Sequence, residues 1–284
     1  IGKACAEVFG KAGAKIVITG RNKENLVKVS GTLNMEHIDN FPIVADSSIE
    51  ADCEKVIRET VSKYQKIDIL INNAGISMRA LFQDLDLSVI EKVMRINFFG
   101  TVYITKFALP YLIESQGSIV GVSSIAGFRG LPARTGYSAS KFAMQGFLES
   151  LRTELRKKHV HVLVAAPGFT SSNIRSTALV KDGSAQGETP RDEGKMMTSE
   201  EVALRIYKAV LRRKRSLVLT RTGKLTVLLN KFFPYFYPMS FVEAIYHFRR
   251  SRRSTHQKNL IIFDDGLGRV LRKIEQDKYT RQGQ

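Results

Sequence analysis

The sequence predicts an α/β fold in which a doubly wound parallel sheet carries helices on both faces. Short apolar runs rich in Val and Ile are typical of strands buried on both faces of such a sheet. These runs alternate along the chain with longer segments of helical periodicity, which predicts βαβ units with right-handed crossovers. With 284 residues, 43% of them apolar, the chain can bury a large core, and this excludes a wholly disordered protein.

Five apolar runs are the expected strands, and four longer segments between them are the expected helices. The strands are "AKIVIT" (14–19), "FPIVAD" (41–46), "IDILIN" (67–72), "GSIVGVSS" (117–124) and "VHVLVAAP" (160–167). The helices are expected near 23–33, 48–64, 87–113 and 136–158. His159 and His161 are interpreted as residues at the start of a strand, and no metal site is predicted.

The net charge of +17 is concentrated at the C-terminal end. Residues 201–284 hold 19 Lys and Arg against 6 Asp and Glu, which leaves only +4 for the first 200 residues. Residues 221–284 are therefore expected to form a basic, aromatic-rich extension that meets an anionic surface. Aromatic and basic residues coincide in 221–253, which predicts peripheral membrane contact; a core-packing or oligomer-forming extension is the alternative. No nucleic-acid motif accompanies the charge.

The cysteines and the prolines of the C-terminal segment indicate the cellular compartment and whether that segment could cross a membrane. Cys5 and Cys53 form neither a disulfide framework nor a metal-ligand spacing, which suits a reducing compartment and a cytoplasmic protein. Pro234 and Pro238 interrupt the apolar residues of 224–253, so no uninterrupted span there approaches the roughly 20 residues of a transmembrane helix.

Tyr137 and Lys141 lie four residues apart at the start of an expected helix, so their side chains share one face. An ammonium group near a phenol lowers the pKa of the phenol, which would make Tyr137 a usable acid for a carbonyl or base for an alcohol. Ser124 lies at the end of the strand 117–124, where open α/β sheets place their ligands. A hydroxyl there can donate a hydrogen bond to a substrate oxygen.

These residues belong to a larger set of motifs in a fixed order. The set comprises Asn72-Asn73-Ala74-Gly75, Asn97, Ser124, Tyr137, Lys141 and Pro167-Gly168. In this combination the sequence resembles the short-chain dehydrogenase/reductase family, of the classical type, over about residues 1–215. The resemblance implies a Rossmann-type catalytic domain, here 1–220, which transfers hydride to or from a nicotinamide cofactor.

The resemblance also implies a role for each matching residue. Tyr137 would donate or accept the proton, and Ser124 would polarise the substrate carbonyl. Lys141 would bind the nicotinamide ribose and tune Tyr137, while Asn97 would hold a water molecule of a proton relay. The cofactor side would be formed by Asp46 at the adenine, by Asn73 and Ala74 along the adenosine, and by Pro167, Gly168 and Ser172 at the nicotinamide, with Gly75 as a further cofactor-binding residue.

The end of the second family strand predicts which cofactor is used. Sites that prefer NAD place a carboxylate there to bind the ribose 2′-hydroxyl, whereas this chain has Gly20 followed by Arg21. A guanidinium can clamp a 2′-phosphate through two hydrogen bonds. We therefore predict NADP(H).

The substrate is expected to be hydrophobic. Residues 168–198 stand where the family has its substrate lid, and Ile174, Ala178, Leu179 and Val180 could cover an apolar ligand. By analogy with similar membrane-associated members, candidates are a steroid, a retinoid or a long-chain 3-keto lipid such as a ketosphinganine. A 3-oxoacyl thioester reductase and a non-catalytic nucleotide-binding membrane scaffold are alternatives. The resemblance further implies a homodimer or homotetramer formed through 87–113 and 136–158.

The first residues, Ile1 and Gly2, match the end of the family's Thr-Gly-x-x-x-Gly-Ile-Gly turn. We therefore expect that the first family strand and most of this phosphate-binding loop are missing from the chain, with Gly2 as the remaining glycine of the motif. That strand lies centrally in the family, so its loss would split the sheet and leave unpaired backbone groups. It would also weaken NADPH binding, because the loop's backbone amides hold the pyrophosphate.

Overall fold

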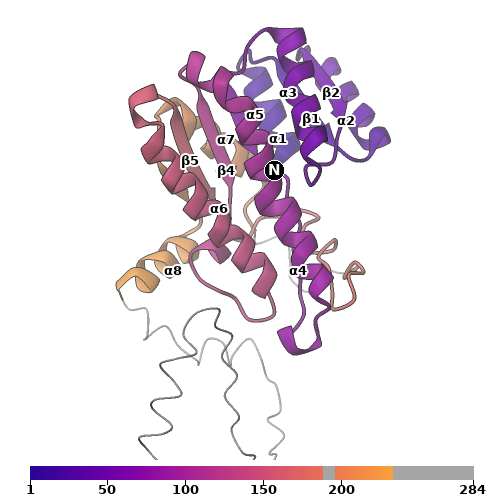
Figure 1. The fold of residues 1–284 in the computed structure, drawn as a ribbon, viewed down its shortest axis with the longest axis vertical. Helices are drawn as coiled ribbons and strands as arrows, with labels where there is room; N and C mark the ends of the chain where they lie inside the picture. Colours follow the sequence, from indigo (N-terminus) through magenta and orange to yellow (C-terminus); the bar gives the residue numbers. More distant parts are fainter. Residues whose placement is uncertain (188–195, 233–284) are drawn as a thin grey trace, which may run out of the picture. The chain divides into compact units, whose positions relative to one another are not determined.

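The computed structural model describes residues 1–187 and 196–232, which fold as six strands and a set of flanking helices (Figure 1). The strands are β1 (Ile16–Gly20), β2 (Asn40–Val44), β3 (Ile69–Asn72), β4 (Ser118–Val122), β5 (His161–Ala166) and β6 (Ser216–Val218). The α-helices are α1 (Gly2–Lys11), α2 (Lys23–Met35), α3 (Glu50–Tyr64), α4 (Leu87–Met94), α5 (Gly100–Glu114), α6 (Thr135–Glu154), α7 (Ser199–Leu211) and α8 (Arg221–Phe232).

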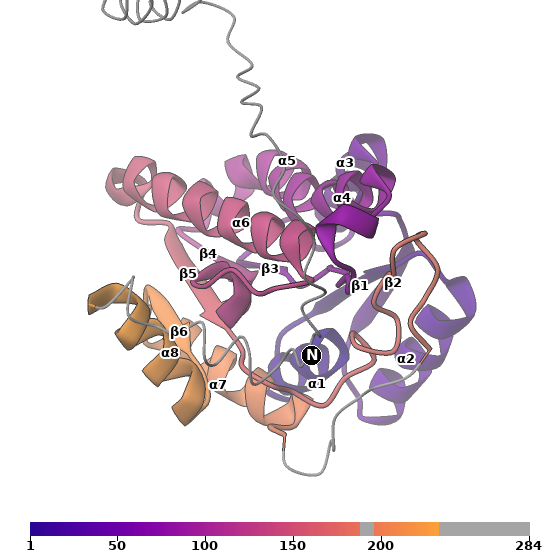
Figure 2. The ribbon, with the colours of Figure 1, turned by 90° about the horizontal axis from the view of Figure 1, so that it is seen from below.

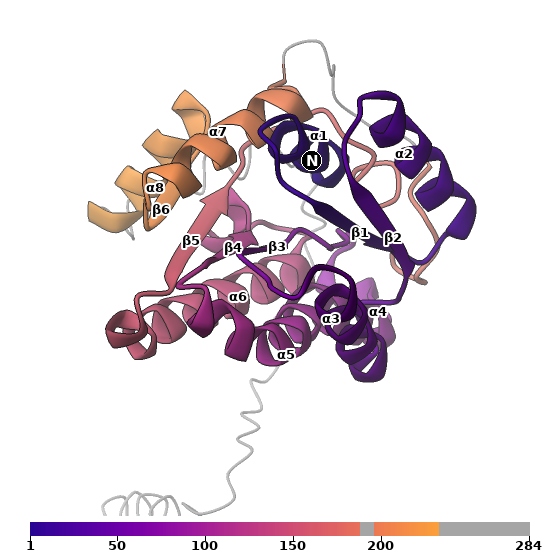
Figure 3. The ribbon, with the colours of Figure 1, turned by 90° about the horizontal axis from the view of Figure 1, so that it is seen from above.

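Every paired strand in this part of the chain runs parallel to its neighbour. Ile69 of β3 pairs with Ser118 of β4, and Ser118 pairs in turn with His161 of β5. Helices α1, α2 and α7 cover one face of the strands, while α3, α5 and α6 cover the other (Figure 3). The expected three-layer α/β fold of Rossmann type is therefore confirmed.

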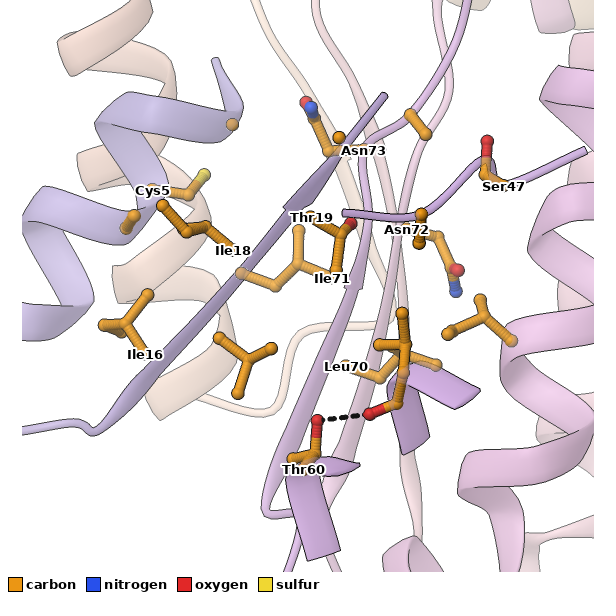
Figure 4. A pocket seen from close by; sticks show the side chains of 18 of the residues that line it. Cys5, Ile16, Ile18, Thr19, Ser47, Thr60, Leu70, Ile71, Asn72 and Asn73 are labelled. Atoms are coloured by element: carbon orange, nitrogen blue, oxygen red, sulfur yellow. Dashed lines mark hydrogen bonds between the residues drawn. The ribbon is translucent and has the colours of Figure 1, made fainter. Parts of the chain in front are cut away.

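The strands form two separate sheets instead of one. β1 pairs with β2, and β3, β4, β5 and β6 follow one another in a second sheet. Between β1 and β3 lies a cavity of about 1340 Å³, lined by both strands and by side chains of α1, α3 and α5 (Figure 4). Apolar residues such as Ile16, Ile18 and Ile71 face this cavity. The expected division of the sheet is thus observed, and it lies beside Asn72 and Asn73.

Two apolar clusters hold the layers together around β4 and β5. On one face, Phe9 of α1 meets Tyr207 of α7 edge to face, with 5.2 Å between the ring centroids. On the other face, Leu112 of α5 and Leu148 of α6 are fully buried beneath the same strands. Burying such side chains contributes about 1.5–3 kcal/mol each, which fixes the carboxyl ends of β4 and β5 in space.

Helix α8 packs on the loop that follows β4, so the described start of the basic extension contacts the catalytic domain (Figure 2). The Asn230 side-chain amide donates to the carbonyl oxygen of Phe128 over 2.9 Å, and Arg129 donates to Asn230 Oδ1 over 3.0 Å. The remainder of the predicted membrane-contacting segment, 233–253, lies outside the described residues, as does the part of the predicted lid at 188–195.

Candidate active site

The predicted catalytic residues gather where β4 ends and α6 begins. Ser124 follows β4 and caps a short 3-10 helix (Ile125–Gly127), accepting a hydrogen bond from the Ala126 N–H over 3.2 Å. Tyr137 lies in the first turn of α6, and Lys141 lies one turn further on the same face. Parallel strands end at one edge of a sheet, so this is the edge where an open α/β sheet binds its ligands.

Tyr137 is buried, with 8% of its surface exposed, and its hydroxyl is hydrogen-bonded to Ser124. The aromatic ring packs among apolar side chains of the same cluster, which are Met78, Leu85, Val89, Val93, Ala126 and Leu179. Burial raises the pKa of the phenol, while the Ser124 hydrogen bond and the charge of Arg134 lower it by smaller amounts. The expected net lowering by Lys141 is therefore wrong for this arrangement, because removal of water from the phenol outweighs the charges near it.

Lys141 is 3% exposed, and its ammonium group donates to the carbonyl oxygen of Val122 over 2.9 Å. Its Nζ atom lies 5.9 Å from the centre of the Tyr137 ring. Burial lowers the pKa of Lys141 to about 8, since the charged form loses its hydration. The side chain is thus close to Tyr137 but has its hydrogen bond directed to the end of β4.

Asn97 lies in a five-residue π-helix (Arg95–Phe99) between α4 and α5, and its side chain is fully buried. Single π-helical turns of this kind are frequent at functional sites. The Asn97 amide donates to the Ile76 carbonyl over 2.9 Å and to Ser140 Oγ over 2.9 Å, and its oxygen accepts from the Ile76 N–H over 2.8 Å. These bonds fix the chain after β3 against α6.

Gly75 lies between Asn97 and Lys141. A Cβ atom at position 75 would stand 3.2 Å from Asn97 Oδ1 and 3.4 Å from Lys141 Nζ. The predicted residues Asn97, Gly75 and Lys141 are therefore brought together, and a side chain at position 75 would crowd the Asn97 oxygen.

The other predicted cofactor residues lie along the same edge, toward β1. A Cβ atom at Gly2 would come within 2.6 Å of the Asn73 side-chain nitrogen, so the start of α1 approaches the end of β3 closely. Asn73 and Ala74 line the cavity between the two sheets. The N-terminus of a helix that begins with glycine beside a strand end suits an anionic ligand. These residues therefore fit the pyrophosphate of a dinucleotide.

Arg21 and Asp46 meet at the ends of β1 and β2. Arg21 Nη1 lies 3.7 Å from Asp46 Oδ2, and the arginine side chain is 60% exposed. Partial burial opposes ionisation of Asp46, but hydrogen bonds from Ser48 and the charge of Arg21 outweigh it and lower the pKa of the carboxyl. Asp46 is therefore ionised at neutral pH and pairs with Arg21.

The residues predicted for the nicotinamide end, Pro167, Gly168 and Ser172, lie in the segment that follows β5. A Cβ atom at Gly168 would meet Thr220 Oγ1 at 2.4 Å, so this glycine is required by the approach of the β6–α8 turn. Ser172 is half-buried just beyond it. Thr220 has φ of 66°. Its contact with Gly168 could not be predicted, because a single threonine far along the chain gives no sequence signal.

The described part of the predicted lid is attached beside the site. Leu179 forms a parallel bridge with Met78, accepts from the Arg79 N–H over 2.7 Å and donates to the Ser77 carbonyl over 2.9 Å. Ala178 is fully buried and Leu179 is 8% exposed. This segment therefore places apolar side chains against the Tyr137 cluster. Ser77 and Arg134, which also reach this region, were not predicted from the sequence.

Comparisons with known proteins agree with this geometry. Residues 1–182 match the family model described as short chain dehydrogenase. The chain is 37% identical over 225 residues to Dehydrogenase/reductase SDR family member 7B of Mus musculus, covering 78% of this chain and 70% of that protein. It is 32% identical to Dehydrogenase/reductase SDR family protein 7-like of Drosophila melanogaster, covering 78% and 69%.

A solved structure has the same fold. The alcohol dehydrogenase of the archaeon Thermococcus sibiricus, complexed with 5-hydroxy-NADP, superposes with a TM-score of 0.67 at 18% identity, covering 77% of this chain and 90% of that one. Taken with the family model and the relatives that are more than 30% identical, the motifs and their arrangement lead to one conclusion: the chain belongs to the short-chain dehydrogenase family.

Proposed function

We propose that this oxidoreductase uses NADP(H) to interconvert a hydrophobic ketone and its secondary alcohol. The observation that carries the proposal is the buried Tyr137 hydroxyl, hydrogen-bonded to Ser124 beside Lys141 and surrounded by apolar side chains. A proton donor in such surroundings suits a carbonyl oxygen on an apolar molecule.

In the proposed reduction, Ser124 and Tyr137 both bind the carbonyl oxygen of the substrate. The Tyr137 O–H bond breaks and its proton passes to that oxygen, while Ser124 donates a hydrogen bond that holds the oxygen in place. The bound nicotinamide would supply the hydride. Positive charge near the phenolate stabilises it, and Lys141 is the charged group on the same face of α6. Asn97 holds Ile76 and Ser140 through its side-chain amide, beside Lys141.

Arg21 supports NADP(H) over NAD(H). It follows Gly20 at the end of β1, its side chain is exposed, and the position that would carry a carboxylate has no side chain. The guanidinium would bind a 2′-phosphate. Its ion pair with Asp46 holds the arginine side chain at the proposed adenosine end.

Exposed apolar residues on α8 support peripheral membrane contact. Leu225, Leu228 and Phe232 are 54%, 53% and 63% exposed and recur at helical spacing, with Lys224 and Lys231 close by. An apolar stripe flanked by cations suits the surface of an anionic bilayer, from which a steroid, retinoid or 3-keto lipid could enter the site. The continuous helical segment Leu87–Glu114 is also apolar and long enough to cross a membrane, but 39% of its most apolar window is buried and it carries Asn97.

A turnover assay tests the reaction. Purified protein would be incubated with NADPH and a panel of steroid, retinoid, 3-keto sphingoid and 3-oxoacyl thioester substrates, with consumption of NADPH and identity of the product as readouts. Turnover of a lipid ketone supports the proposal. Turnover confined to thioesters favours the alternative reductase, and binding of NADPH without any turnover favours the scaffold.

Liposome flotation tests the membrane contact separately. Replacing Leu225, Leu228 and Phe232 with Glu should abolish flotation with vesicles that contain phosphatidylserine. The matched control is Leu211→Glu at the end of α7, which removes an equally exposed apolar side chain, 65% exposed, and should leave flotation unchanged.

A second copy of the chain is the other proposed partner. Phe99 and Phe142, 43% and 45% exposed, lie on the helices that the resemblance assigns to the dimer or tetramer interface. The neighbouring rings of Phe98 and Phe147 contact each other edge to face, which extends this aromatic surface. Analytical ultracentrifugation of wild type and Phe142→Glu would show whether an oligomer forms through this face.

A further inference from the structure

Arg134 stands next to the start of α6, three residues before Tyr137, at a place where the backbone is strained. Ala133 before it has φ of 56°, in the left-handed region that non-glycine residues rarely adopt, and its carbonyl accepts from the Ala80 N–H over 3.1 Å. Arg134 is the residue immediately before the helix, and residues three apart on a helix face the same side. The turn therefore directs Arg134 toward the side of α6 that carries Tyr137.

The guanidinium of Arg134 is anchored on the segment that follows β3. It donates a hydrogen bond to Ser77 Oγ, and Ser77 is only 2% exposed. The Ser77 carbonyl in turn accepts from Leu179 of the lid segment, so one buried serine links the arginine to the lid. Arg134 itself is half-buried, and a partly desolvated charge acts over a longer range than a charge in water.

Within the described part of the chain, most side chains packed against Tyr137 are apolar. Lys141 approaches it from its own helix and Arg134 from the helix start. The other elements packed against the ring contribute apolar residues to that contact, namely Met78 and Leu85 from the loop after β3, Val89 and Val93 from α4, Ala126 after β4, and Leu179 from the lid segment. Among the described residues, Arg134 thus joins Lys141 as a cation near Tyr137, and it comes from the turn before α6 whereas Lys141 comes from the helix itself.

We propose that Arg134 is a positioning residue of the active site, which, held by Ser77, stabilises the negative charge that Tyr137 acquires when its proton passes to the substrate. The inference rests on the proposed carbonyl reduction. The charge of Arg134 lowers the pKa of Tyr137 against the effect of burial. Because an arginine stays charged at all working pH values while the pKa of Lys141 is lowered to about 8, Arg134 remains a cation where Lys141 loses its proton.

The test uses Arg134→Gln, Arg134→Lys and Ser77→Ala, with Arg58→Gln on the exposed face of α3 as the matched control. Fluorotyrosine would be incorporated at position 137 and its titration followed by fluorine NMR, which requires no turnover. Arg134→Gln should raise the titration midpoint by about 1 unit and lower kcat for ketone reduction about 10-fold, with little change in KM. Arg134→Lys should keep both the titration midpoint and kcat close to their wild-type values. Ser77→Ala should shift the midpoint by an intermediate amount.

The two readouts separate this inference from the proposed function. A shifted titration in a protein that turns over no ketone would support the role of Arg134 and refute the proposed reaction. An unshifted titration in folded Arg134→Gln, with circular dichroism equal to wild type, would overturn the role of Arg134. A rise in KM limited to anionic substrates, with kcat and titration unchanged, would also overturn it, since the arginine would then bind substrate instead of acting through Tyr137.

Discussion

Arg21 Nη1 and Asp46 Oδ2 stand 3.7 Å apart across the ends of β1 and β2, at the proposed adenosine end of the cofactor site. The preceding residue, Gly20, leaves ordinary space for a side chain, since a Cβ atom there would be 3.7 Å from Leu26. An acidic side chain could therefore be placed at position 20 without steric clash, but the chain has glycine there and the cation Arg21 next to it. This relationship makes cofactor preference a property that a small change can reverse.

The double change Gly20→Asp and Arg21→Ser should convert a preference for NADPH into one for NADH. It removes a charged hydrogen-bond donor from the 2′-phosphate and adds an acceptor for a 2′-hydroxyl, and each such bond contributes about 1.5–3 kcal/mol. We expect kcat/KM for NADPH to fall roughly 10- to 100-fold and that for NADH to rise. Steady-state kinetics with both cofactors measure this, and Arg58→Ser on α3 should leave the ratio unchanged. An unaltered ratio in the double variant would remove Arg21 from the cofactor site.

Tyr137→Phe should lower kcat for ketone reduction about 10²- to 10⁴-fold, because it removes only the proton donor. The ring stays in its apolar cluster, so the melting temperature should change little. The control is Tyr103→Phe on α5, which keeps its stacked contact with Phe99 and should retain full activity. Turnover of wild-type rate in Tyr137→Phe would exclude the tyrosine as the acid.

The strands and long helices could be predicted because each depends on a local pattern. The runs 117–124 and 160–167 became β4 and β5, whose residues are buried throughout, which is why they read as continuous apolar segments. β6 was missed because its three residues, Ser216–Val218, are too few for a periodicity and are only partly buried. Helix α7 was also missed, although the capping box between Thr198 and Glu201 was a readable signal.

The candidate site could be predicted only as far as its residues belong to known motifs. Ser124, Tyr137 and Lys141 stand at recognisable spacings, and the fold brings them together. Arg134 and Ser77 lie 57 positions apart and meet through a side-chain hydrogen bond, which no local pattern reveals. The pKa of Tyr137 was misjudged for a related reason, since burial depends on Met78 and Leu179, which are distant in sequence.

The cavity between β1 and β3 predicts that an added strand would stabilise the protein. Both strands have backbone groups facing it, and its apolar lining includes Ile16 and Ile71. We expect a chain preceded by five apolar residues and a glycine-rich loop to fill the cavity, since burying each large side chain contributes about 1.5–3 kcal/mol. The melting temperature should rise by roughly 2–4 °C for each kcal/mol gained, and NADPH should bind more tightly.

An extension of the same length made of Gly and Ser is the control for this experiment, since it adds chain without apolar side chains. It should alter neither the melting temperature nor the dissociation constant for NADPH. Equal stability and equal affinity in the apolar and the Gly/Ser versions would contradict the prediction.

Lys141 predicts a pH dependence of stability with a definite sign. Its pKa is lowered from 10.5 to about 8 in the folded protein, because burial disfavours the ammonium form. Below pH 8 the side chain is charged in both states and the folded state bears the full penalty. Between about 8 and 10.5 the unfolded state binds more protons than the folded state, so stability from this group rises with pH, and the penalty is gone above that window.

Chemical denaturation of wild type and Lys141→Met, in steps from pH 7 to pH 10.5, measures this contribution. The methionine side chain is of similar length and does not titrate, so the other ionisable groups cancel in the difference. We expect the stability of wild type relative to Lys141→Met to increase across this window by up to roughly 3 kcal/mol. A constant difference would mean that Lys141 keeps its ordinary pKa, and the ammonium group would then have to be hydrated despite its burial.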